Sequence, residues 1–239
     1  MRAPSPLLVG DIAQAVAELR AAPLELLLNE DWLERDFLLR LGLNDEMLEE
    51  FPVELYSCCG HGLKSWQYPR QFSRYLRFLT SRNIRSYVEI GSRHGGTFII
   101  TVEYLDRFAA IGRACAIDLE ESPILRRYQQ EFRDFHYHIG SSQEPSGREM
   151  LRAGWDLALI DGDHSRQGCW ADYQTLKDNA RTIALHDIVN DNCPGVGEVW
   201  RHIRSIMPAA RVFEQVDQYR EAYERTGKRF LGIGAVALA

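Results

Sequence analysis

The sequence lacks the features that mark membrane, secreted and nucleic-acid-binding proteins. No apolar run among its 239 residues approaches the roughly 20 residues needed to span a bilayer, so no membrane partner is expected. Met1–Gly10 has neither the apolar core nor the cleavage site of a signal peptide. Basic residues are not in excess, because the formal net charge is −6 and the pI is near 5.7. This balance disfavours general nucleic-acid binding, so no nucleic-acid partner is expected either.

Cysteine is also scarce. The five cysteines are odd in number and show no C-x-x-C spacing, and a chain of this size needs no disulfide staples. Reduced thiols and a cytoplasmic location are therefore expected. Cys58 and Cys59 stand near His61, but their spacing matches no zinc pattern. We interpret Cys58–Pro69 as a loop that leads into the core domain.

Apolar residues, in contrast, are plentiful enough for a core. They make up 45% of the chain, which suits one α/β domain with an extension. Residues 11–50 show apolar residues at helical spacing, and Pro23, Gly42 and Pro52 divide this region into short helices. We predict a helical extension over residues 1–80, which serves as a cap or as the surface of a homo-oligomer, and a second domain over residues 81–239.

Strand-like and helix-like segments alternate from Tyr87 onward. The first five strands are predicted at residues 87–90, 114–117, 136–139, 155–160 and 182–185, and residues 211–216 and 230–238 read as a terminal hairpin. Such alternation favours right-handed crossovers and a parallel sheet with helices on both faces. The predicted fold class is α/β, with a mostly parallel, Rossmann-like sheet of seven strands and an antiparallel last strand.

A glycine-rich turn follows the first predicted strand. In the stretch YVEIGSRHGGT, Gly91, Gly95 and Gly96 stand between an apolar strand and an apolar helix. A strand that passes through such a turn into a helix brings a ligand close to bare backbone and to a helix N-terminus. The spacing G-x-x-x-G-G differs from the G-x-G-x-x-G of nicotinamide sites, which disfavours a nicotinamide-dependent reductase.

Polar residues stand at or just beyond the ends of five successive strands, where open α/β sheets bind ligands. They are Glu89, Asp118, Ser142, Asp161 and Asp187. An acidic residue at the end of the second strand accepts hydrogen bonds from a ribose diol in dinucleotide sites. Asp118 holds that position, so the sequence favours a nucleoside derivative as the ligand.

The motifs that contain these residues resemble those of a known enzyme family. EIGSRHGGT, AIDLE and DLALIDGDH resemble the cofactor motifs of class I S-adenosylmethionine-dependent methyltransferases. The chain is most similar to a bacterial family of small sugar or natural-product O-methyltransferase-like proteins. The shared segments are WQYP at Trp66–Pro69, IDGDHS at Ile160–Ser165, HDI at His186–Ile188 and PGV at Pro194–Val196. The resemblance runs from about Gly62 to the C-terminus and implies S-adenosyl-L-methionine as cofactor.

The resemblance also implies roles for single residues. Glu89 and Gly91 would contact the methionine part of the cofactor, and Asp118 would contact the ribose hydroxyls. The G-S-S-Q run resembles the adenine-side loop of catechol O-methyltransferases, although many relatives carry an acidic residue where this chain has serine. The full set of expected cofactor-binding residues is Glu89, Gly91, Ser92, Gly95, Thr97, Asp118, Ser142, Gln143 and Asp161.

Methyl transfer to a hydroxyl also requires removal of a proton, for which the sequence offers two routes. His164, with Asp161, is the candidate catalytic base, because a histidine is suited to this role near neutral pH. Alternatively, Asp161 and Asp187 resemble the metal-binding aspartates of catechol-type enzymes and would hold Mg²⁺. His186 is a further candidate ligand, and an imidazole would favour another divalent cation.

The preferred interpretation is an O-methyltransferase that acts on a small molecule, a saccharide or a natural product. Two alternatives stay open at this point. The chain could be a non-catalytic, S-adenosylmethionine-binding partner subunit, or, less in keeping with the glycine spacing, a nicotinamide-dependent reductase. The sequence does not identify the acceptor.

Overall fold

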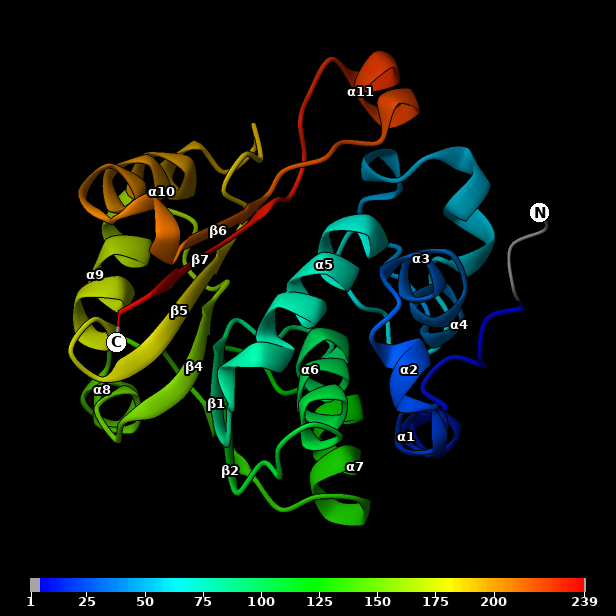
Figure 1. Ribbon diagram of the computed structural model, residues 1–239, viewed down its shortest axis with the longest axis horizontal. Helices are drawn as coiled ribbons and strands as arrows, with labels where there is room; N and C mark the ends of the chain where they lie inside the picture. Colours follow the sequence, from blue (N-terminus) through cyan, green and yellow to red (C-terminus); the bar gives the residue numbers. More distant parts are fainter. Residues whose placement is uncertain (1–4, 239) are drawn as a thin grey trace.

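The alternation that begins at Tyr87 folds into one seven-stranded sheet (Figure 1). The structure is a computed structural model that describes residues 5–238. The strand order is β3-β2-β1-β4-β5-β7-β6. Strands β1 to β5 are parallel, and β7 is antiparallel to both of its neighbours. The strands are β1 (Ser86–Ile90), β2 (Arg113–Asp118), β3 (His136–Ile139), β4 (Trp155–Ile160), β5 (Ala180–His186), β6 (Val212–Gln215) and β7 (Ile233–Ala237). The predicted Rossmann-like fold is confirmed.

Helices cover both faces of this sheet (Figure 1). Because side chains alternate along a strand, Tyr87 packs into one core while Val88 and Ile90 pack into the other. The first face is covered by α5 (Pro69–Leu79), α6 (Gly96–Asp106) and α7 (Pro123–Glu131). The second face is covered by α8 (Pro145–Leu151), α9 (Arg166–Leu176) and α10 (Pro194–Ile206).

The N-terminal residues form an additional layer outside α5 and α6 (Figure 1). Its elements are α1 (Ile12–Ala21), α2 (Leu24–Leu27), α3 (Glu30–Trp32), the π-helical turn η1 (Leu33–Phe37), α4 (Leu38–Leu41) and the 3-10 turns η2 (Leu48–Glu50) and η3 (Val53–Cys58). Apolar residues of this layer share one core with α6 and the sheet. The parts on either side of residue 80 thus share this core. The domain division at residue 80 stays a prediction.

Two seven-residue helices differ from the expected pattern. The sequence analysis predicts no helix over residues 145–151 or 217–229, but these ranges contain α8 and α11 (Arg220–Thr226). Both helices are short and mostly polar, so their sequences have no apolar stripe from which a helix could be predicted. Helix α11 is fixed from outside, because Arg225 donates to the carbonyls of Glu49 and Phe51 at 3.0 and 2.7 Å. The remaining short turns are η4 (Thr80–Arg82) and η5 (Ala209–Arg211).

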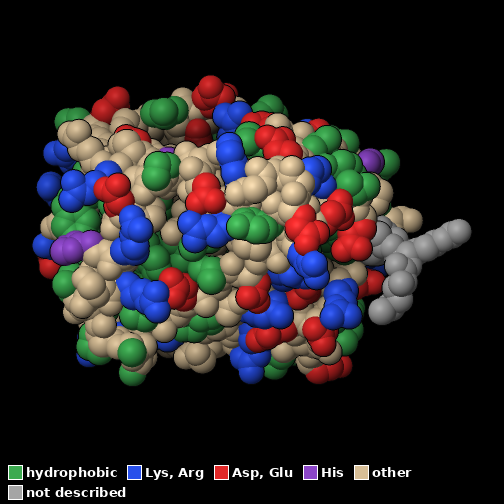
Figure 2. Space-filling model, turned by 90° about the horizontal axis from the view of Figure 1, so that it is seen from above, with side chains coloured by type: hydrophobic (Ala, Val, Ile, Leu, Met, Phe, Trp, Pro, Cys, Tyr) green, Lys and Arg blue, Asp and Glu red, His purple; other side chains and the backbone are tan. Residues whose placement is uncertain are grey.

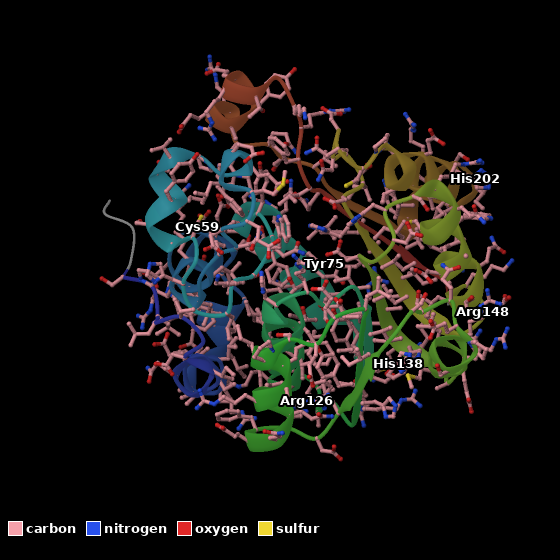
Figure 3. The ribbon with its side chains drawn as sticks, turned by 180° about the vertical axis from the view of Figure 1, so that it is seen from behind. Cys59, Tyr75, Arg126, His138, Arg148 and His202 are labelled. Atoms are coloured by element: carbon pink, nitrogen blue, oxygen red, sulfur yellow. The ribbon has the colours of Figure 1, made fainter. Side chains whose placement is uncertain are left out.

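All five cysteines are free. Cys59 lies in the N-terminal layer, Tyr75 lies near the middle of the molecule, and His202 lies on the opposite side (Figure 3). Among the residues described, none of the helices has the length and apolar character to cross a membrane. The sequence analysis found no signal-peptide features in residues 1–10. Residues 1–4 of this segment lie outside the described residues. Seen from above, acidic and basic side chains are interspersed on the surface (Figure 2).

Candidate active site

A cavity of about 710 Å³ lies at the C-terminal edge of the sheet. The strand register explains its position, since Ile90 is paired with Ile117 of β2 and with Ile160 of β4. The residues that follow these partners therefore meet at one edge. Eight residues singled out in the sequence line this one cavity: Gly91, Asp118, Ser142, Gln143, Asp161, His164, His186 and Asp187.

The glycine turn allows β1 and β4 to end side by side. Gly91 has φ +83°, and a Cβ atom there would overlap the backbone carbonyl of Asp161. Its amide donates to the carbonyl of Ile117 at 2.8 Å, so the turn also continues the pairing with β2. Gly91 is thus required both by backbone conformation and by lack of space.

Asp118 is held in place by the same turn. Its carboxylate accepts the backbone amide of Arg93 at 2.7 Å and that of Glu120 at 3.0 Å. Each carboxylate oxygen has two acceptor positions, so further donors can still bind. This arrangement suits a carboxylate that receives two neighbouring hydroxyl groups, as expected for a ribose.

Four of the expected cofactor residues lie outside the cavity lining. These are Glu89, Ser92, Gly95 and Thr97, which are placed beneath or behind the turn. Glu89 is 1% exposed and accepts a hydrogen bond from the Tyr87 hydroxyl. Burial raises the pKa of Glu89 well above its ordinary range, so the protonated form is favoured. A contact between Glu89 and the methionine part of the cofactor stays a prediction.

The expected adenine side is organised by a residue that the sequence analysis did not single out. Asp172 of α9 is 1% exposed and accepts hydrogen bonds from Ser142 Oγ at 2.7 Å and Gln143 Nε2 at 3.3 Å. Gln143 Nε2 also donates to the carbonyl of Gly168 at 3.0 Å. These two acceptors fix the direction of the Gln143 amide, and its oxygen remains available to accept from a ligand.

Replacement of Asp172 with asparagine is expected to weaken S-adenosylhomocysteine binding about five- to tenfold, because Ser142 and Gln143 lose the charged acceptor of their hydrogen bonds. Isothermal titration calorimetry measures the change. Glu149→Gln, an exposed change on the adjacent helix α8, is the matched control. Equal affinity in Asp172→Asn and wild type would show that the loop holds its position without this carboxylate.

The reactive end of the cavity is a cluster of two carboxylates and two imidazoles at the ends of β4 and β5. His164 Nε2 lies 3.3 Å from Asp161 Oδ1 and 3.1 Å from Asp187 Oδ2. His186 Nδ1 lies 3.1 Å from Asp161 Oδ1. The other ring nitrogen of His186, Nε2, is buried and has no hydrogen-bond partner within residues 5–238. Asp187 has φ +61°, an uncommon conformation for a residue other than glycine.

The aspartates and histidines of this cluster shift one another's pKa values. Hydrogen bonds from His164 to the carboxylates of Asp161 and Asp187 raise the pKa of His164 to about 10. Burial alone would lower the pKa of His186, but the same aspartates raise it to about 9. Burial alone would raise the pKa of Asp187, but the two histidines hold it below its ordinary value. Both histidines are therefore protonated at neutral pH when nothing else occupies the cluster.

The cluster also has the donor set of a divalent-cation site. Ligand atoms of Asp161, His186 and Asp187 all lie within 4.8 Å of one another, and those of His164, Asp187 and Cys193 form a second such group. Carboxylate and imidazole donors together suit Mn²⁺, Fe²⁺ or Zn²⁺ better than Mg²⁺, which prefers oxygen ligands alone.

Of the opposite wall of the cavity, the sequence analysis named Trp66 and predicted that the helical extension serves as a cap. Glu46, Met47, Glu50 and Trp66 line this wall from the N-terminal layer. Glu46 joins this wall to the glycine turn, since it accepts from Arg93 at 2.9 Å and lies 2.7 Å from His94 Nε2. The acidic residues of this wall were not singled out, because acidic residues in a helical extension look like an ordinary solvated face.

With this geometry established, the chain was compared with known proteins. Residues 88–188 match a family model described as a methyltransferase domain. This segment, which runs from β1 to just past β5, is therefore similar to a methyltransferase domain. The match supports the predicted S-adenosylmethionine-dependent methyltransferase and disfavours the nicotinamide alternative further. No curated protein gave a significant match.

Solved structures resemble this chain at low sequence identity. An O-methyltransferase from Streptomyces achromogenes, involved in tomaymycin synthesis and solved with S-adenosylmethionine, is 17% identical over 73% of this chain and 82% of its own, with a TM-score of 0.50. An O-methyltransferase from Bacillus cereus, solved with S-adenosylhomocysteine, is 17% identical over 68% and 78%, with a TM-score of 0.48. A putative RNA methyltransferase from Pyrococcus horikoshii is 10% identical over 89% and 94%, with a TM-score of 0.48. The first of these shows a shared fold.

Proposed function

We propose that this methyltransferase transfers the methyl group of S-adenosylmethionine to a hydroxyl oxygen of a small molecule, a saccharide or a natural product. The observation that carries the proposal is the cluster of Asp161, His164, His186 and Asp187 inside the cavity that also contains Asp118. A hydroxyl is a weak nucleophile until it loses its proton, and such a cluster can assist that loss. A cavity of about 710 Å³ suits a cofactor with a small acceptor.

The donor would occupy the half of the cavity next to the glycine turn. Asp118 would accept the ribose hydroxyls, Gly91 would let the methionine tail approach the backbone, and Ser142 and Gln143 would face the adenine. The methyl group would then point toward Asp161 and the ends of β4 and β5. The reaction is an in-line displacement, so much of the rate comes from the alignment of the acceptor oxygen with the methyl carbon.

The hydroxyl proton would leave through a side-chain base or through acidification by a bound cation. His164 is the base predicted from the sequence, and it needs to be neutral to accept a proton. Because Asp161 and Asp187 favour its protonated form, His164 would act as base once a cation engages those carboxylates. When bound by Asp161, His186 and Asp187, a divalent cation would supply positive charge next to the acceptor oxygen.

The decisive experiment is calorimetry with S-adenosylmethionine and S-adenosylhomocysteine, followed by measurement of S-adenosylhomocysteine release with a panel of phenols, sugars and other hydroxylated compounds. Binding together with release in the presence of a hydroxylated compound supports the proposal. Tight binding without release on any compound would favour a non-catalytic partner subunit. Absence of binding by the wild-type chain would contradict the proposed function.

A separate prediction concerns the cation. Mn²⁺ is expected to bind at least tenfold more tightly than Mg²⁺ if the His186 imidazole is a ligand, and Asp187→Asn is expected to weaken Mn²⁺ binding about tenfold or more. Calorimetry with each metal chloride measures both effects. Asp163→Asn is the matched control, because this carboxylate lies outside the cluster and accepts the backbone amide of Ser165 at 2.8 Å. Equal Mn²⁺ binding by Asp187→Asn and wild type would exclude Asp187 as a ligand.

A homo-oligomer through the N-terminal helices and a cytoplasmic location stay predictions. The acceptor is proposed to be a small molecule rather than a nucleic acid or a membrane lipid. The mixed charge of the surface in Figure 2 is consistent with this choice.

A further inference from the structure

The N-terminal wall of the cavity contains a buried carboxyl group that the proposed function leaves without a role. Glu50 is the last residue of η2 and lines the cavity together with Trp66. It is only 2% exposed. Asp187, at the end of β5, lines the same cavity and acts electrostatically on Glu50. A residue of the N-terminal layer therefore faces the reactive end of the methyltransferase domain.

The contacts of Glu50 leave one carboxylate oxygen available. Oε2 accepts a hydrogen bond from Trp66 Nε1 at 2.8 Å. Within residues 5–238, no group donates to Oε1 and no Lys or Arg forms an ion pair with the carboxylate. The nearby Arg225 donates instead to the backbone carbonyls on either side, those of Glu49 and Phe51. The Glu50 carbonyl accepts the Tyr68 hydroxyl, so the backbone is fixed while the carboxyl group is not neutralised.

Glu103, another buried glutamate of this chain, is an example of a carboxylate with a structural role. Glu103 of α6 is fully buried and accepts two hydrogen bonds from Arg20, at 2.7 and 2.9 Å. It also accepts the Tyr128 hydroxyl at 2.5 Å and forms an ion pair with Arg133 at 3.4 Å. Glu103 thus has the cations and donors that a buried charge needs. Glu50 lacks them, which is unfavourable for stability but useful for a group that must gain and lose a proton.

The surroundings of Glu50 keep its proton affinity high. Burial is the main cause, and it raises the pKa of Glu50 to about 7. The Trp66 hydrogen bond and His186 act in the opposite direction, whereas Asp187 and Glu49 add to the increase. The charge of Glu50 in turn raises the pKa values of Cys193 and Tyr68. A carboxyl group that titrates near neutral pH can act as a base under physiological conditions.

We propose that Glu50, in place of His164, is the base of this site, and that its free oxygen Oε1 takes the proton of the acceptor hydroxyl. This inference rests on the proposed function and deepens it. As the O–H bond breaks, the proton moves to Oε1 and the hydroxyl oxygen forms a bond to the methyl carbon. The sulfur–methyl bond breaks at the same time, and its electron pair stays on sulfur. The products are the methyl ether, S-adenosylhomocysteine and protonated Glu50, which then releases its proton to solvent.

The test compares wild type, Glu50→Gln and Glu50→Asp with an acceptor found in the hydroxylated panel. Glu50→Gln is expected to lower kcat about 100-fold or more, with little change in KM, because glutamine keeps the shape and the Trp66 contact but cannot accept the proton. Wild-type kcat is expected to rise with pH through a midpoint near 7, and this limb should be absent in Glu50→Gln. Glu50→Asp is expected to restore part of the rate. An unchanged kcat and pH profile in Glu50→Gln would overturn the proposal.

Two controls separate this proposal from the proposed function. All variants are expected to bind S-adenosylmethionine at wild-type strength by calorimetry, so a wild-type chain that does not bind it contradicts the proposed function instead. Glu49→Gln removes an exposed carboxylate from the neighbouring position, outside the cavity lining. It is expected to retain the wild-type kcat. A similar loss in Glu49→Gln would indicate a general effect of charge and overturn the specific role of Glu50.

Thermal unfolding tests the state of Glu50 without any acceptor. The pKa of Glu50 is raised in the folded chain above its ordinary value of 4.5. Its contribution to stability is therefore present below about pH 4.5 and is lost as the pH rises through about 7. At about pH 8, Glu50→Gln should thus unfold about 3 °C or more above wild type, with little difference at about pH 5. A lower unfolding temperature of Glu50→Gln at both pH values would identify a structural carboxylate and overturn the proposal.

Discussion

Replacing Asp118 with alanine is expected to weaken S-adenosylmethionine binding about 100-fold, because two charge-assisted hydrogen bonds to the ribose are lost. The backbone amide of Arg93, which donates to Asp118 at 2.7 Å, also loses its acceptor. The glycine turn would then be less well ordered around the donor. Calorimetry with S-adenosylmethionine and S-adenosylhomocysteine should show the same loss, since the two ligands share the ribose.

Two further variants define what Asp118 contributes. Asp118→Asn keeps the shape and one acceptor oxygen, so its loss is expected to be about tenfold. Glu120→Ala removes the same charge two residues away, and its side chain has only a 3.6 Å ion pair with Arg93 while its backbone amide still donates to Asp118. It is expected to bind both ligands at wild-type strength. Equal binding by Asp118→Ala and wild type would contradict the ribose assignment.

Gly91→Ala is expected to lower the free energy of unfolding by about 2–5 kcal/mol and to abolish detectable donor binding. Alanine at φ +83° is strained, and its methyl group would overlap the Asp161 carbonyl. The ends of β1 and β4 would have to separate, which would displace both Asp118 and Asp161 from their positions. Thermal unfolding and calorimetry with S-adenosylhomocysteine measure the two effects.

Gly154→Ala provides a matched control for this change. Gly154 has φ +82°, almost the same as Gly91, but a Cβ atom there would have no heavy atom within 4 Å. The alanine is therefore expected to cost only the conformational strain, about 1–2 kcal/mol, and to leave donor binding intact. If Gly91→Ala behaved like Gly154→Ala in both assays, close approach of the two strand ends would not be required for the site.

The strand-end residues of the candidate site could be predicted from the sequence because their position depends on local order along the chain. A polar residue that follows a strand lies at the sheet edge, whichever strands are neighbours, and parallel strands place these edges together. Asp118, Asp161 and Asp187 were located in this way, and all three line the cavity. Asp172 could not be located, since its role arises from contacts between α9 and a loop about 30 residues earlier in the chain.

Strand order and charge states required the tertiary structure. The insertion of β7 between β5 and β6 follows from pairing over the last part of the chain, and the alternation of elements does not specify it. His164 looked like a neutral base in the sequence because its second carboxylate partner, Asp187, is 23 residues away and meets it only in the fold. Proton affinity depends on such partners and on burial, so residue type alone does not determine it.

The sequence by itself determined the fold class and the edge of the sheet where the candidate site lies. Hydrophobic periodicity and glycine spacing act over a few residues, so a linear pattern contains that information. Only the tertiary structure brought η2 of the N-terminal layer onto the cavity and placed Glu50 near Asp187. Its burial without a neutralising cation comes from packing between segments far apart in the chain, and that packing is what makes Glu50 a candidate base.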